Sequence, residues 1–389
     1  MRATWKRHHP WVVAFFSCLV GMQSTLQAAP YTPEQDDVVL VTLNERQQRL
    51  AQTHITSGEK RIDEAAAIQL AQAQIRYSRE HEDPRFLGYA EATLAPLSDS
   101  RDPAVAILTA SIEQQRHQFS HAQTRLKKLL ERAPSQAQGW LLLANIQRVQ
   151  GQYSDAQHSC QQAAPYLSPA ITILCQASIQ AMTGHAKKSY AVLQRLADSN
   201  QNLGADYALW LQTILAELAL QQGFEEDAQR HIEKGLAVSS ADNYLHLLRS
   251  DIWLQTKQPQ RVIADLERWE DRDGALLRLA IAGKQSNHAS ATRWASQYAE
   301  RMQDVQDSGR TVHLREHARY LLEVTEQPSA ALSIAKENWQ TQKELADLRL
   351  LEASARASND AATLRALQDE YTGLYGAPRS KSQHSENLQ

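Results

Sequence analysis

A small residue, most often alanine, returns along the sequence at the start of predicted helices with a period of about 34. The positions are Ala90, Ala122, Ala156, Ser189, Ala228 and Val262, whose numbers differ in turn by 32, 34, 33, 39 and 34. A period near 34 in a helical pattern is typical of stacked helix-turn-helix repeats, in which each pair buries its apolar face against the next pair. Such stacks present long concave surfaces, so the period indicates a chain built to hold other molecules.

The composition agrees with an all-α fold. Gly (14) and Pro (12) are scarce in 389 residues and aromatic residues make up only 6%, which suits helices that pack closely through small side chains. A repeat stack grows lengthwise, because each unit touches only its neighbours. We therefore expect one solenoid rather than two or three globular domains.

The unit from 137 to 170 carries the clearest pattern, with large, small and turn-forming residues at positions 4, 7, 8, 15, 17, 20 and 27. These residues are Trp140, Leu143, Ala144, Gly151, Tyr153, Ala156 and Ala163. The pattern resembles the tetratricopeptide repeat (TPR) family. The resemblance implies a right-handed superhelical solenoid of stacked helix-turn-helix repeats that binds proteins and has no catalytic activity of its own.

The resemblance covers residues 62–270, and apolar periodicity continues beyond them. We expect degenerate helical repeats over 271–376, with helices near 275–284, 289–303, 311–325, 328–341, 344–357 and 360–373. Residues 30–61 include an amphipathic stretch that suits a cap on the first repeat, and the polar tail 377–389 is expected to be disordered. Gly151, Gly184 and Gly223 stand where first helices should end and where a positive φ is needed.

Residues 1–29 have the features of a secretory signal peptide. Arg2, Lys6 and Arg7 precede an apolar stretch over 11–22, and small residues follow near Ala28. The stretch is shorter than the roughly 20 apolar residues that span a bilayer. We therefore expect a secreted, periplasmic protein that does not span the membrane after cleavage; the alternatives are a lipoprotein signal at Cys18 and an uncleaved anchor.

The charge balance argues against nucleic acid as a partner. The sequence has 41 Lys and Arg against 44 Asp and Glu, and loss of residues 1–29 removes three cations and no acid, which leaves a net charge of about −6. The charges are interspersed, without a basic run that would follow a phosphate backbone. A protein or peptide of the cell envelope is the expected partner.

Cys160 and Cys175 are the cysteines that remain in the mature chain. They fall on neighbouring helices of adjacent repeats, so that a disulfide is geometrically conceivable in an oxidising compartment. The alternative is that both are small buried apolar residues. In either case their role is structural.

His313, Glu316 and His317 form an H-x-x-E-H sequence, the inverted zinc-peptidase pattern. On one helix the two histidines could share a zinc ion with the glutamate as general base, which would make the chain a zinc-dependent hydrolase. The alternative is two surface histidines on a late repeat, and such a short motif favours it. We therefore expect no catalytic residue, no metal site and no cofactor.

The TPR resemblance also implies which side chains line the concave groove. On the first helices of the central units these candidate partner-binding residues are Asn145, Arg148, Trp210, Glu217, Tyr244 and Asp251. Trp210 and Tyr244 suit binding anchors, although either could instead pack between repeats. Ile107, Leu141 and Leu174 stand where family members that grip a carboxyl-terminal chaperone tail carry lysine, so that ligand is not expected.

Overall fold

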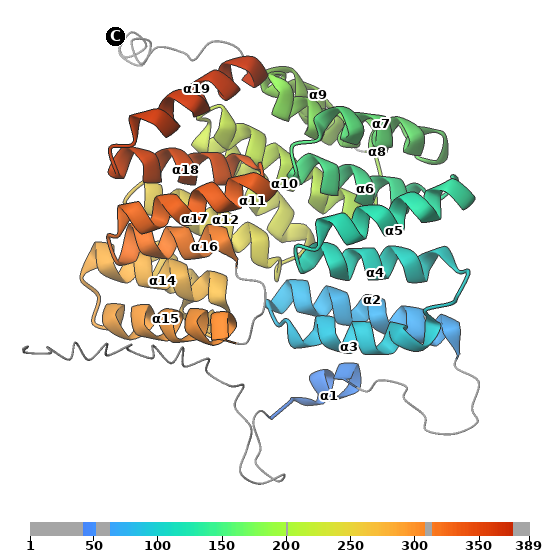
Figure 1. The fold of residues 1–389 in the computed structure, drawn as a ribbon, viewed down its shortest axis with the longest axis horizontal. Coiled ribbons are helices and arrows are strands. Elements are labelled where there is room, and N and C mark those ends of the chain that lie inside the picture. The colour runs from blue at the N-terminus through green and yellow to red at the C-terminus, as the bar shows by residue number, and fades with distance from the viewer. Residues whose placement is uncertain (1–41, 52–62, 200, 308–312, 376–389) are drawn as a thin grey trace, which may run out of the picture.

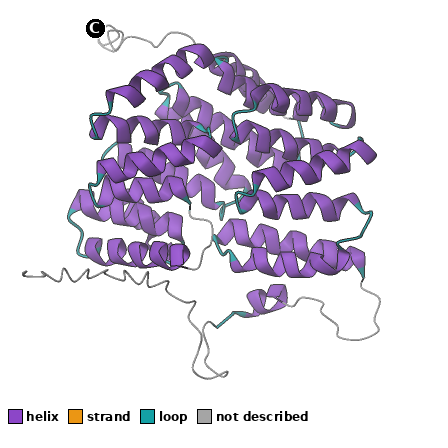
Figure 2. Cartoon of the chain, viewed as in Figure 1, coloured by secondary structure: helices purple, strands orange, loops and turns teal. Residues whose placement is uncertain are grey.

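The computed structural model describes residues 42–51, 63–199, 201–307 and 313–375. These residues form 19 α-helices and no strands, and 81% of them are helical. Successive helices pack as antiparallel neighbours (Figures 1 and 2). The expected all-α helical solenoid is confirmed.

Short α1 (Glu45–Ala51) is followed by nine helix pairs in chain order. The first helices of the pairs are α2 (Glu64–His81), α4 (Pro103–Gln115), α6 (Ala137–Val149), α8 (Pro169–Gln180), α10 (Ala205–Gln221), α12 (Asn243–Gln255), α14 (Asp273–Ser286), α16 (Leu314–Arg319) and α18 (Leu345–Ala357). The second helices are α3 (Arg85–Leu94), α5 (Phe119–Arg132), α7 (Tyr153–Ala163), α9 (Ala186–Asp198), α11 (Glu225–Val238), α13 (Pro259–Leu266), α15 (Ala291–Asp307), α17 (Pro328–Thr341) and α19 (Ala361–Tyr375).

A residue with positive φ ends the first helix of every pair. Glycine holds this position in three pairs, at Gly151, Gly184 and Gly223, as expected. In the other six pairs the residues are Glu82, His117, Lys257, Asn287, Glu326 and Asn359. The spacing along this series stays close to the period of the buried small residues. The repeat therefore continues to the end of the described chain, although outside the middle its turn residue is no longer glycine.

The C-terminal helices lie close to the expected ranges, with one informative exception. The helix expected over 311–325 begins at Leu314 and continues as a π-helical turn, η5 (Tyr320–Val324). His313 precedes the helix and therefore does not lie on it. The signal segment 1–29 and the tail 377–389 lie outside the described residues.

The apolar core runs along the chain as a series of clusters. One cluster joins Leu174, Leu193, Leu215 and Ile232 across neighbouring pairs, and another joins Leu276 and Leu279 to Trp294 and Tyr298. Small residues at the close helix contacts, such as Ala122, Ala156 and Ala228, are fully buried. Each pair thus depends on its neighbours to cover its apolar stripe.

The solenoid also winds back on itself through polar contacts. The Asn243 amide donates to Glu82 Oε1 at 2.7 Å, and the Gly274 backbone N–H donates to Glu82 Oε2 at 2.8 Å. These bonds join α2 to α12 and α14, which are far away in the sequence. In Figure 1 the pairs from α2 to α7 stand opposite those from α14 to α19, with α10 to α12 behind them.

Cys160 on α7 and Cys175 on α8 form a disulfide. Their Cα atoms are 5.9 Å apart, within the range that a disulfide requires. Both side chains are buried, and they lie in one apolar cluster with Ala144, Ala156 and Ile179. The bond therefore joins the third helix pair covalently to the fourth.

None of the helices in the described ranges is both long enough and apolar enough to cross a bilayer.

We expect the double substitution Cys160→Ser and Cys175→Ser to lower the free energy of unfolding by about 3 kcal/mol. The reason is the entropy that the loop closed by the disulfide regains in the unfolded chain. Urea unfolding followed by circular dichroism measures the change. Dithiothreitol should destabilise the wild-type protein by a similar amount and leave the variant unaffected; an equal effect on both proteins would contradict the assignment.

Candidate functional site

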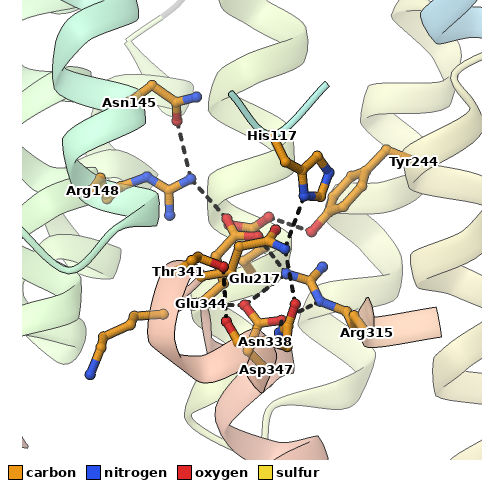
Figure 3. A network of polar contacts seen from close by, with 12 residues as sticks. His117, Asn145, Arg148, Glu217, Tyr244, Arg315, Asn338, Thr341, Glu344 and Asp347 are labelled. Atoms are coloured by element: carbon orange, nitrogen blue, oxygen red, sulfur yellow. Dashed lines mark hydrogen bonds and ion pairs between the residues drawn. The ribbon is translucent and has the colours of Figure 1, made fainter. Parts of the chain in front are cut away.

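Four of the six expected groove residues lie together (Figure 3), and a fifth, Asp251, lies seven residues after Tyr244 on the same helix. Asn145 and Arg148 come from α6, Glu217 from α10, and Tyr244 and Asp251 from α12. We call the surface formed by these five residues the interior face. Each of them is bonded within this chain (Figure 3 shows the first four), and the bonds of Arg148 and Asp251 reach the later repeats.

At the centre of this region, two guanidinium groups share Glu344. Arg148 Nη2 lies 3.1 Å from Glu344 Oε1, and Arg315 Nη2 lies 2.8 Å from Glu344 Oε2 (Figure 3). Burial opposes ionisation of Glu344, but Arg315 and Arg148 outweigh it and lower its pKa to about 2. Glu344 is therefore a carboxylate throughout the neutral range, and it links α6 to α16 and α18.

Arg315 also binds Asp347 through two bonds. The Nε–Oδ1 distance is 2.6 Å and the Nη2–Oδ2 distance is 2.8 Å, a bidentate geometry that suits a guanidinium. Asp347 is fully buried, and it accepts two more hydrogen bonds, from the Asn338 amide and the Glu344 backbone N–H. The last of these completes a capping box at the start of α18.

His117 joins the same network from the turn between α4 and α5. The Gln342 amide lies 3.2 Å from His117 Nδ1, and the ring centroids of His117 and His313 are 5.2 Å apart. Burial, together with the neighbouring His313 and Arg315, lowers the pKa of His117 to about 4. A neutral imidazole can accept the Gln342 hydrogen bond at Nδ1, which a protonated one cannot.

Glu217 and Tyr244 form a second polar pair on the interior face. The Tyr244 hydroxyl donates to Glu217 Oε1 at 2.6 Å. Burial raises the pKa of Glu217, and Glu344 adds to the effect while Arg148 opposes it. Tyr244 nevertheless keeps 46% of its surface accessible. Its ring therefore offers contact area to a ligand.

Asp251 binds two arginines from the later repeats. Arg278 Nη2 lies 2.7 Å from one carboxylate oxygen and Arg319 Nη1 lies 2.9 Å from the other. Burial opposes ionisation, but the two guanidinium groups lower the pKa of Asp251 overall. Asp251 thus joins α12 to α14 and α16.

Trp210 differs from the other expected groove residues. Its side chain is half-buried and packs against the apolar clusters that include Ala219 and Ile179, with its ring centroid 6.4 Å from that of Tyr207. Of the two roles considered for this residue, its contacts favour packing between repeats.

The H-x-x-E-H residues do not form the arrangement that a shared zinc site on one helix would require. His313 lies outside α16, with its ring against His117. Burial opposes ionisation of Glu316, but Arg315 and His313 outweigh it and lower its pKa. Within the described ranges no three His, Cys, Asp or Glu side chains are arranged to hold a metal ion.

A cavity of about 220 Å³ lies elsewhere, between α1 and α2. Its lining residues are Arg46, Arg49, Leu50, Ala73, Arg76 and Tyr77. Glu80 and Glu45 approach Arg46 and Arg49 only loosely, at 3.9 and 3.7 Å. The recess is basic, and it is separate from the interior face.

The partners of the interior face could not be recognised from the sequence. Glu344, Arg315 and Asp347 belong to weak repeats, and Glu344 is 196 residues from Arg148. A usable local signal was the capping box that Glu344 and Asp347 form. It marks a helix start and reveals nothing about the distant arginine.

Two of the solved structures that are similar to this chain are TPR proteins of low sequence identity. A tetratricopeptide repeat protein from Parabacteroides merdae ATCC 43184 aligns with 74% of this chain and 99% of its own, at 12% identity and a TM-score of 0.36. The TPR domain of P58(IPK) aligns with 77% of this chain and 99% of its own, at 12% identity and a TM-score of 0.25. No protein-family model and no curated protein matches the sequence. Because these TM-scores are low, the solenoid assignment rests on the helix packing.

We expect Arg315→Ala to lower the free energy of unfolding by about 3–5 kcal/mol, because it leaves the buried Asp347 carboxylate without its ion-pair partner. Chemical denaturation measures the loss. The matched control is Arg356→Ala, which removes an exposed ion pair with Glu352 on α18 and should cost about 0.5 kcal/mol or less. Equal losses of unfolding free energy in the two variants would show that the contacts of Arg315 stabilise the fold no more than a surface ion pair.

Acidification should weaken the fold through His117. Its folded pKa of about 4 lies below the usual 6.5, so the unfolded chain takes up the proton first and the stabilisation is lost as the pH falls from 6.5 towards 4. For this residue we expect the free energy of unfolding to fall by about 2 kcal/mol between pH 7 and pH 5. His117→Asn, which tolerates the positive φ, should flatten the pH profile of the urea midpoint. An unchanged slope of this profile would contradict the expectation. His231, whose pKa is also about 4, remains in both proteins and contributes equally to both profiles.

Proposed function

We propose that this protein is a non-catalytic TPR-like scaffold that binds a protein or peptide partner on its interior face. The observation that carries the proposal is that this face already holds a segment of polypeptide. The backbone N–H of Lys343 donates to the Val149 carbonyl at 2.7 Å, beside the Arg148–Glu344 ion pair. Main-chain and carboxylate contacts of this kind are those by which a scaffold recognises a peptide.

Tyr244 supports the same proposal. It combines a large accessible ring with a hydroxyl bonded to Glu217, and tyrosine contributes contact area at a low entropic cost. Arg148 and Asp251 add charges of both signs to the same face. A partner segment would meet a mixed polar surface rather than an apolar groove.

We propose that the protein acts outside the cytoplasm, in the periplasm or elsewhere in the cell envelope. The support is the signal-like segment 1–29 together with the Cys160–Cys175 disulfide, since such bonds persist in oxidising compartments. Lipid attachment at Cys18 is the alternative route to the same compartment. Pulse labelling of the expressed full chain follows its processing. Comparison with Cys18→Ala distinguishes cleavage of a signal peptide from lipid attachment at Cys18.

The proposed function is tested by affinity capture of the tagged chain 30–389 from the envelope fraction of its source cells. We expect a partner that crosslinks to the interior face and is lost with Tyr244→Ala. Mass spectrometry of the crosslinked peptides identifies both surfaces.

The matched control is Tyr166→Ala. Tyr166 is 49% exposed, close to the 46% of Tyr244, but it lies in the short helix after α7 and outside the interior face. It should leave capture unchanged. A partner that is lost equally with both variants, or that crosslinks only outside the interior face, would refute the proposed binding site.

A further inference from the structure

The turn between α17 and α18 is held against the end of α6 and the start of α7 by three kinds of contact. Lys343 donates its backbone N–H to Val149, the Tyr153 hydroxyl donates to the Lys343 carbonyl at 3.3 Å, and Glu344 binds Arg148. We call residues 342–344 the latch turn. Its backbone and its carboxylate are both recognised, as they would be in a bound peptide.

The α6–α7 turn is shaped for this close approach. Gly151 has a φ of +74°, and a Cβ atom there would lie 2.8 Å from Lys343 Cδ. The Val149 carbonyl belongs to the last turn of α6, where carbonyls have no partner within the helix. The latch turn supplies the missing donor.

The contacts between the latch turn and α6–α7 are polar. The apolar clusters, by contrast, join helix pairs that follow one another in the sequence. The apolar cluster of the last repeats contains residues from Ala318 to Leu367 and none from the first half of the chain. No apolar cluster among the described residues joins 314–375 to 64–198. Release of the latch turn from α6 would therefore divide no apolar cluster, while the packing of α19 against the short helix η3 (Ala181–Thr183) would stay in place.

From these contacts we infer that the latch turn is an intramolecular ligand, which blocks the interior face until an acidic partner segment of the same chemistry replaces it. The inference rests on the proposed function. The replacing segment carries a free backbone N–H for Val149 and, on the next residue, a carboxylate for Arg148. Such a partner competes with Glu344. Its apparent affinity is therefore its intrinsic affinity multiplied by the fraction of molecules in which the latch turn has left α6.

Hydrogen exchange of full-length protein tests whether Glu344 holds the latch turn closed. Glu344→Gln removes the charge but keeps an oxygen that can cap α18, and Arg315 keeps its bidentate bond to Asp347. We expect exchange at the Lys343 amide to rise about tenfold or more, because the charge-assisted bond to Arg148 is lost.

The control for this experiment is Glu352→Gln on the same helix, which loses only an exposed pair with Arg356. Exchange at Lys343 should then match that of the wild type. If Glu344→Gln also leaves Lys343 exchange unchanged, the latch is refuted.

A peptide with the sequence of residues 338–350 tests whether an added segment can take the place of the latch turn. Fluorescence anisotropy should show it binding the Glu344→Gln protein about tenfold or more tightly than the wild type, where the site is occupied. Binding should be lost when Arg148→Met is added, or when the peptide itself carries Glu344→Gln. Equal affinity for wild type and variant, insensitivity to Arg148→Met, or no binding to the opened protein would each overturn the inference.

The outcomes separate this inference from the proposed function. Successful peptide exchange without a captured envelope partner would leave the latch standing and count against the scaffold role. A captured partner that binds wild type and Glu344→Gln equally would leave the scaffold role standing and refute the latch.

Discussion

Glu344 is shared by two guanidinium groups that the chain supplies from far apart, Arg148 on α6 and Arg315 on α16. Taking a carboxylate out of water is costly unless opposite charges and hydrogen bonds replace the solvent. Both arginines hold Glu344 in place, and Arg315 is fixed in turn by buried Asp347. This arrangement fixes the turn between α17 and α18 against α6, where the other contacts are hydrogen bonds around the same turn. Further along the chain, α19 packs against the short helix η3 (Ala181–Thr183).

The repeat architecture is local, and so it could be predicted from the sequence. Ala122, Ala156 and Ala228 are buried where helices approach closely, and Gly151, Gly184 and Gly223 end first helices with positive φ. The late repeats keep the same backbone geometry with residues such as Lys257 and Asn287. A consensus based on glycine misses these turns, which explains why the pattern weakens in the sequence while the helices continue.

The candidate site could be predicted only in part. The positions on α6, α10 and α12 follow from the TPR resemblance, and five of them form the interior face. Their bonding partners do not follow, because Glu344 and Arg319 approach them through the path of the whole superhelix. The zinc pattern, which we did not expect to bind metal, requires His313 and His317 on one helix, and α16 starts one residue after His313.

The separation of apolar and polar contacts sets how this molecule would respond to mechanical load. The apolar clusters connect each helix pair to the next, whereas the contacts that cross the superhelix at Glu344 and at Glu82 are ion pairs and hydrogen bonds. The last helix, α19, also packs against the short helix η3 (Ala181–Thr183). Tension applied between the two ends would break the crossing contacts first and lengthen the superhelix while the pairs stay folded. The disulfide between α7 and α8 would set a limit to extension at that point. The end-to-end length of the protein and its accessible binding surface would then increase together.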